Sequence, residues 1–138
     1  MADKIPARWT GRIELEITEF KEDPSNDAAF GIFVDVKGSG SRCETVRVYF
    51  NEDFFPRYFK IRWEKKLPQE EKRILHDKRD LFVRWALLKI EDYLKGRIQG
   101  ETIWVDYEHD AAWAEKVDKG LIRPQSTPAG EHVFIYNA

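Results

Sequence analysis

Three segments in the first half of the chain alternate strictly between apolar and polar residues: 12–18, 30–36 and 46–50. Such alternation is typical of β-strands that bury one face and leave the other in water. Two short stretches rich in Gly, Ser, Pro, Asn and Asp, 23–27 and 38–41, separate these segments and favour tight turns. Strands joined by short turns pair most simply in antiparallel fashion, so the pattern predicts a three-stranded antiparallel meander.

The pattern then changes to that of a long helix between Pro68 and Gly96. Pro suits a first helical turn and Gly a C-terminal cap, and about 27 residues between them would span about 40 Å. Residues 81–94 contain apolar or aromatic side chains around most of the helix circumference. One sheet face cannot bury so wide a surface, so this half is predicted to be a central helix covered by a second element, or part of a homodimer interface.

The last third predicts a strand, a short helix and a final strand. Residues 103–107 alternate as a strand, Trp113, Val117 and Leu121 recur at helical spacing, and residues 131–136 form the last apolar segment. Residues 127–130 resemble a turn. The order is therefore βββαβαβ, and we predict a single compact α+β domain over 1–138.

This order is similar to that of the ribonuclease-H-like fold, as a resemblance of topology alone. The resemblance implies acidic metal ligands on the first strand, the first helix and the fourth strand. In this sequence Glu14 or Glu16, Glu91 and Asp106 would have to fill those roles.

Composition agrees with a folded domain: of 138 residues, 42% are hydrophobic and 14% aromatic, which excludes a disordered chain. A single cysteine excludes an internal disulfide. No apolar run is long enough to span a membrane and the N-terminus lacks a secretory signal, so we expect a cytoplasmic protein with no membrane partner.

Charge is unevenly distributed behind the net value of -2. Residues 1–56 carry 7 basic against 11 acidic side chains, residues 57–97 carry 13 against 7, and residues 98–138 carry 3 against 7. A basic middle between acidic ends indicates either a surface for an acidic partner or a middle that packs against the two ends.

The basic middle begins with a segment, 57–66, in which cations and aromatic rings alternate. If extended, it could bind nucleic acid or another polyanion, because cations hold phosphates and rings stack on bases. The alternative is an edge strand whose cations blunt the edge. The residues assigned to polyanion binding are Arg57, Tyr58, Lys60, Arg62, Trp63, Lys65 and Lys66.

A cluster of potential metal ligands lies where the fourth strand meets the short helix. Carboxylate and imidazole groups of Asp106, Glu108, His109 and Asp110 could bind Mg²⁺ or Mn²⁺. The alternative is that Asp110 caps the helix while the others lie in a solvated turn. A metal site here would favour a hydrolase or nuclease centred on Asp106.

No catalytic or cofactor-binding motif is present in the sequence. We therefore expect a non-catalytic protein-interaction domain without a cofactor, with a protein partner or a homodimer formed through residues 81–94. Nucleic-acid binding through residues 57–66 and metal-dependent hydrolysis at Asp106 are the two alternatives.

Overall fold

A computed structural model of the chain describes residues 9–25, 28–38, 40, 42–60, 73 and 76–138. It confirms the predicted α+β class. In chain order the elements are β1 (Arg12–Ser25), β2 (Ala28–Lys37), β3 (Cys43–Asn51), α1 (Phe54–Phe59), α3 (Arg79–Leu94), β4 (Thr102–Val105), α4 (Tyr107–Asp118), β5 (Thr127–Gly130) and β6 (Val133–Asn137).

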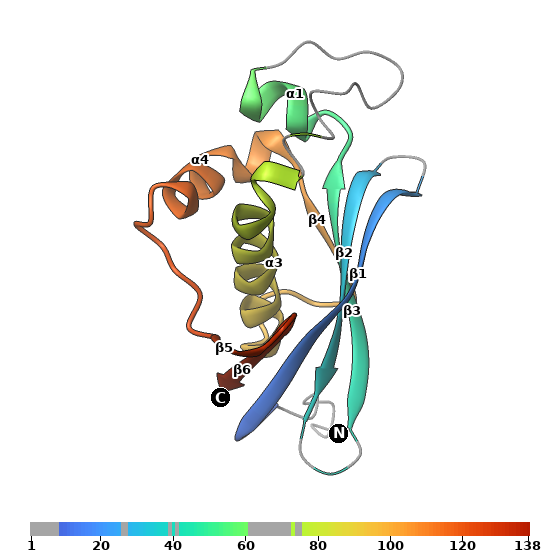
Figure 1. Cartoon of the computed structure of the whole chain (residues 1–138), viewed down its shortest axis with the longest axis vertical. Coiled ribbons are helices and arrows are strands. Elements are labelled where there is room, and N and C mark those ends of the chain that lie inside the picture. The colour runs from blue at the N-terminus through green and yellow to red at the C-terminus, as the bar shows by residue number, and fades with distance from the viewer. Residues whose placement is uncertain (1–8, 26–27, 39, 41, 61–72, 74–75) are drawn as a thin grey trace, which may run out of the picture.

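The described strands form one six-stranded sheet in the order β4-β3-β2-β1-β6-β5 (Figure 1). β1, β2 and β3 form the predicted antiparallel meander. β4 lies parallel to β3, because the chain crosses over through helices before it re-enters the sheet. β6 pairs antiparallel with β1, and β5 pairs antiparallel with β6. The predicted count of five strands was therefore wrong.

The additional strand is β5, which occupies residues 127–130 where the sequence predicts a turn. Its register joins Thr127 to Ile135 and Pro128 to Phe134. All four of its residues are exposed, so it carries no alternation of apolar and polar side chains that would have identified it. It is a strand because β6 supplies its hydrogen-bonding partner.

A second difference is helix α1, which the sequence did not predict. Phe54 and Tyr58 lie one helical turn apart, and their rings stack with centroids 5.4 Å apart and planes within 5° of parallel. Both rings also meet Trp85 of α3 edge-on, at 5.4 Å and 5.2 Å. Packing against α3 thus favours a helix in a segment whose local pattern does not indicate one.

The long helix predicted between Pro68 and Gly96 is interrupted before α3. Residues 73, 76 and 77 are helical, residues 68–72 and 74–75 lie outside the described residues, and the central helix α3 is a separate element. It begins at Arg79, and Lys78 before it has φ -105° and ψ 20°, outside the helical region. α3 lies across one face of the sheet, with α4 beside it and β5–β6 at its C-terminal end (Figure 1). None of the described helices is long and apolar enough to cross a membrane.

The apolar surface of residues 81–94 is used inside the chain. Trp85 is fully buried: its ring contacts Phe50 of β3 at 6.0 Å, and its indole Nε1 donates to the carbonyl oxygen of Ala114 in α4 at 3.0 Å. Leu81, Phe82, Ala86, Leu87, Ile90 and Leu94 are buried with it. The prediction that a second element covers this helix is confirmed, and the wide apolar surface no longer argues for a homodimer interface here.

Glu91 is the polar exception in this interior, with 1% of its surface exposed. Its Oε1 accepts the backbone N–H of Gln125 at 3.1 Å, and its Oε2 accepts the N–H of Ser126 at 3.0 Å and the Ser126 hydroxyl at 2.6 Å. A buried carboxylate is tolerated when donors surround it. These bonds hold the segment before β5 against α3.

Candidate functional site

The basic–aromatic segment is described as far as Lys60. Arg57 and Tyr58 belong to α1, so the extended conformation assumed for this part of the segment was wrong. Lys60 follows the helix with a left-handed backbone, φ 55° and ψ 45°. Arg62, Trp63, Lys65 and Lys66 lie outside the described residues.

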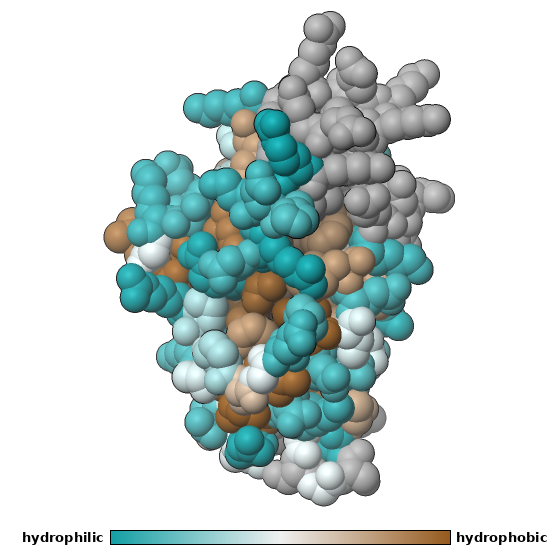
Figure 2. Space-filling view, in the orientation of Figure 1, coloured by the Kyte–Doolittle hydropathy of each residue, from teal (hydrophilic) through white to brown (hydrophobic). Residues whose placement is uncertain are grey.

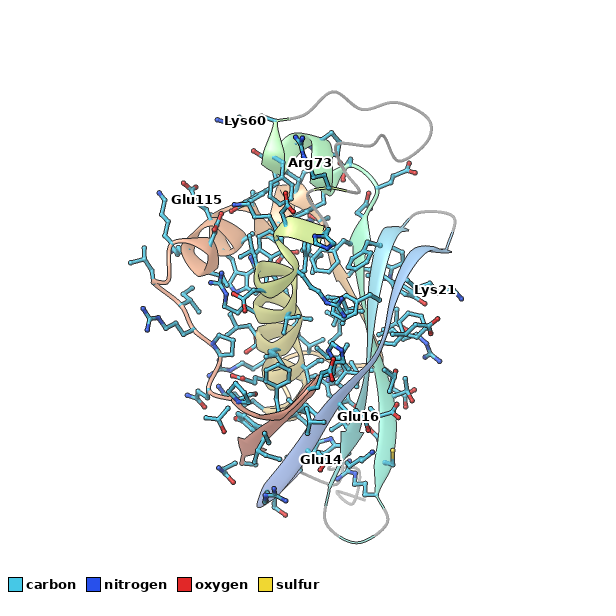
Figure 3. All side chains as sticks on the ribbon, in the orientation of Figure 1. Glu14, Glu16, Lys21, Lys60, Arg73 and Glu115 are labelled. Carbon is cyan, nitrogen blue, oxygen red and sulfur yellow. The ribbon has the colours of Figure 1, made fainter. Side chains whose placement is uncertain are left out.

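Two of the described members of this segment, Arg57 and Tyr58, already have partners. The guanidinium of Arg57 lies 4.3 Å from the centre of the Tyr107 ring, and the hydroxyl of Tyr58 donates to Asp118 at 3.0 Å. Burial, followed by this hydrogen bond, raises the pKa of Tyr58 well above its usual value. Tyr58 and Lys60 also line a cavity of about 640 Å³ between α1 and α4, at the end where Figure 3 labels Lys60 and Glu115.

The acidic cluster acts as the cap of helix α4. Asp106 is the N-cap residue, and its Oδ1 accepts the backbone N–H of His109 at 2.7 Å. Asp110 reaches back to the N–H of Asp106 at 3.0 Å and pairs with Lys89 of α3 at 2.7 Å. Glu108 is exposed. The expected helix cap is present, but Asp106 provides it rather than Asp110.

These contacts leave little basis for a metal centre. Within the described part of the chain, no three His, Cys, Asp or Glu side chains are placed to hold one ion. The carboxylates implied by the ribonuclease-H-like resemblance also lie apart: Glu91 is buried on the helix side, while Asp106 follows β4 at the sheet edge. β3 and β2 separate β4 from β1, the strand of Glu14 and Glu16.

The cap should be visible in the titration of His109. Its side-chain bond to Asp106, at 2.9 Å, raises the pKa of His109, and the backbone N–H of His109 lowers the pKa of Asp106. We expect Asp106→Asn, which keeps a capping oxygen but loses the charge, to return the His109 pKa toward its ordinary value of about 6.5. The imidazole resonances followed by NMR against pH measure this directly.

The same two pKa shifts determine how the stability of the fold depends on pH. A raised His109 pKa stabilises the fold fully below the unfolded value of about 6.5, and this contribution is lost as the pH rises through the folded pKa. The lowered Asp106 pKa stabilises the fold above the unfolded value, and this contribution is lost as the pH falls through the folded pKa.

Glu108→Gln is the matched control for Asp106→Asn in the NMR titration and should move the His109 pKa less. Equal shifts in both variants would contradict the cap.

A different candidate site lies on the sheet face that no described helix covers. Because alternate residues of a strand point to opposite faces, burial of Val46, Val48 and Phe50 toward α3 places Thr45, Arg47 and Tyr49 on this open face. The register sets Arg47 opposite Phe33 of β2, and Tyr49 opposite Trp104 of β4. We call Phe33, Arg47, Tyr49 and Trp104 the aromatic row.

The aromatic row is a contiguous set of contacts across three strands. The Tyr49 ring meets the Trp104 ring edge-on at 5.1 Å and the Phe33 ring at 6.0 Å. The Arg47 guanidinium lies 5.5 Å from the centre of the Phe33 ring. Trp104 is 41% exposed, and the only other large hydrophobic side chain so exposed among the described residues is Leu121.

Charged side chains continue the open face beyond the aromatic row. Along β1 and β2, Lys37 pairs with Glu16 at 2.6 Å and with Glu14 at 3.6 Å, and the Thr45 hydroxyl donates to Asp35 at 2.8 Å. The hydrogen bond from Lys37 to Glu16, together with the charge of Glu16, raises the pKa of Lys37. This acidic end contrasts with the other end of β1, where Lys21 points away from the sheet (Figure 3).

Sequence reasoning identified the strands that carry this face but not the aromatic row. Phe33, Tyr49 and Trp104 could each be assigned to the polar side of an alternating strand. Their proximity depends on the pairing of β3 with β2 and β4, which the sequence does not specify. No family model matches the chain, and comparisons with curated proteins and with solved structures find no match either.

Proposed function

We propose that this chain is a non-catalytic interaction domain that binds a second copy of itself through the open face of the sheet. The aromatic row carries the proposal. Trp, Tyr and Arg are the residues that most often dominate the energy of protein interfaces, and here they lie together on an accessible face.

Charge favours a protein over a nucleic acid on this face. Glu14, Glu16, Glu19 and Asp35 lie beside the aromatic row and would repel phosphates, while Lys37 is already paired. A mixture of both signs around an apolar centre is instead what the rim of a protein interface shows.

The arrangement of these charges favours a second copy as the partner. Glu14, Glu16 and Asp35 outnumber Arg12 and Lys37 at one end of the face, whereas Lys21 and Arg47 outnumber Glu19 at the other. A two-fold axis that lies between the two faces, perpendicular to the strands, would bring the acidic end of one copy over the basic end of the other. Two sheets packed face to face in this way would also cover the exposed surface of Trp104.

Removing the most exposed ring tests this proposal. We expect Trp104→Ala to weaken self-association about 30-fold or more, since truncating a tryptophan that anchors an interface costs about 2 kcal/mol or more. Sedimentation velocity from micromolar to millimolar concentration measures the effect. The association of the unmodified chain should also weaken as salt screens the charged ends.

Leu121→Ala is the matched control, because Leu121 is the other large exposed hydrophobic side chain and follows α4 on the helix side. It should leave association unchanged. A chain that remains monomeric at millimolar concentration would overturn the proposal. So would equal association of the Trp104→Ala and Leu121→Ala variants.

A further inference from the structure

A groove of about 430 Å³ lies on the helix side of the molecule, away from the open sheet face. It runs between α3, the segment that follows α4, and the β5–β6 pair. Figure 2 shows hydrophobic residues gathered over this region and bordered by hydrophilic side chains. The apolar lining consists of Val83, Leu87, Pro124, Pro128 and Phe134.

Two arginines, Arg84 and Arg123, also line the groove, and each donates a hydrogen bond to a main-chain carbonyl oxygen. Arg84 donates from Nη1 to the carbonyl of Val117 at 2.8 Å and from Nε to Asp80 at 3.0 Å. Arg123 donates from Nε to the carbonyl of Gly120 at 3.2 Å. Within the described part of the chain, these bonds use two of the five N–H groups of Arg84 and one of those of Arg123.

The charge of the groove is positive. Of the described residues that line it, Asp80 alone carries a carboxylate, against the guanidiniums of Arg84 and Arg123. Asp80 pairs with Arg84 at 3.0 Å, so these three side chains leave a net charge of +1 in the groove. Remaining guanidinium N–H groups next to an apolar surface suit an anionic oxygen group attached to an apolar body.

The size of the groove agrees with such a ligand. Small-molecule sites are commonly concave, largely apolar and about 300–1,000 Å³ in volume, with a few polar groups that fix the orientation of the ligand. We infer that the groove binds an anionic amphiphile. Its aliphatic chain lies along Val83, Leu87 and Phe134, and its carboxylate or phosphate head meets Arg84 and Arg123.

Decanoate is a direct probe of this inference, with binding measured by calorimetry and by NMR shifts of the groove residues. Decanoate should bind about 15-fold more tightly than octanoate, since it has two more CH₂ groups and each buried CH₂ contributes about 0.8 kcal/mol. It should also bind more tightly than decanol and decylammonium, which keep the chain but lose the negative charge. Decyl phosphate then distinguishes the two heads, because whichever binds more tightly identifies the head that the groove prefers.

The substitution Arg123→Gln tests the role of the guanidinium. It should weaken decanoate binding about tenfold while leaving decanol unchanged, because a charge-assisted hydrogen bond is lost. The matched control is Arg97→Gln, at an exposed arginine beyond the end of α3 that does not line the groove. Thermal unfolding of both variants confirms that they fold.

Three results would overturn the inference. One is the absence of decanoate binding at millimolar concentration, and another is equal binding of decanoate and decanol. The third is equal binding by the Arg123→Gln and Arg97→Gln variants. Repeating the titration on the Trp104→Ala variant separates this groove from self-association through the open sheet face.

Discussion

Replacing Trp85 with Ala should lower the free energy of unfolding by about 3–5 kcal/mol, the range for large aromatic side chains removed from a core. Trp85 is fully buried and lies within 5.2–6.3 Å, ring centre to ring centre, of five other aromatic side chains. Truncation would leave a cavity at the point where the sheet, α1 and α4 meet α3. It would also leave the Ala114 carbonyl without its indole donor.

The midpoint and slope of urea unfolding measure this loss. A loss of about 3–5 kcal/mol is comparable to the whole stability of many domains, so Trp85→Phe provides a folded intermediate case that keeps most of the ring volume. The matched control is Trp104→Ala, the same substitution on the open sheet face, measured at a concentration where the chain is monomeric. It should cost about 1 kcal/mol, the value of its ring contact with Tyr49. Similar losses at both positions would contradict the assignment of Trp85 to the centre of the core.

Replacing Glu91 with Ala should cost about 3 kcal/mol, although it removes a buried charge that faces no described cation. The reason is that three donors lose their acceptor: the part-buried N–H of Gln125 and the buried N–H and hydroxyl of Ser126. A buried donor without a partner costs about 1–3 kcal/mol. We therefore expect the segment 125–137 to loosen before the rest of the sheet.

Hydrogen exchange of the backbone amides measures this local effect. The N–H groups of Gln125 and Ser126 should exchange faster in Glu91→Ala, while those of β2 and β3 change little. Ser126→Ala removes one of the three donors and should cost less than Glu91→Ala. Glu101→Ala, at an exposed glutamate, is the control and should change stability by less than about 0.5 kcal/mol. Unchanged exchange at residues 125 and 126 would contradict the role assigned to Glu91.

The parts of the fold that could be predicted are the strands in which apolar and polar residues alternate along the sequence. Segments 12–18, 30–36 and 46–50 alternate because one face of the sheet is buried and the other is open. All three lie in observed strands, β1, β2 and β3. β5 and α1 have no such pattern, because pairing with β6 and packing against Trp85 determine them. These interactions join residues far apart in the sequence.

The candidate sites also differ in how far the sequence could predict them. Helix capping is local, so the sequence could place a cap at residues 106–110, although Asp106 rather than Asp110 provides it. The aromatic row and the two-arginine groove each combine residues from three or more elements. Neither can be recognised before the strand order and the position of α4 are known.

The central place of β1 in the sheet has a consequence for how the chain folds. β1 is flanked by β2, which follows it directly, and by β6, which lies more than a hundred residues later. During synthesis the β1–β2–β3 meander can form early, but one edge of β1 stays unpaired until residues 133–137 have been made. Such long-range pairing slows folding and leaves a strand edge open to other chains in the meantime. The nascent chain is therefore most exposed to aggregation along β1, the strand that becomes interior to the finished sheet.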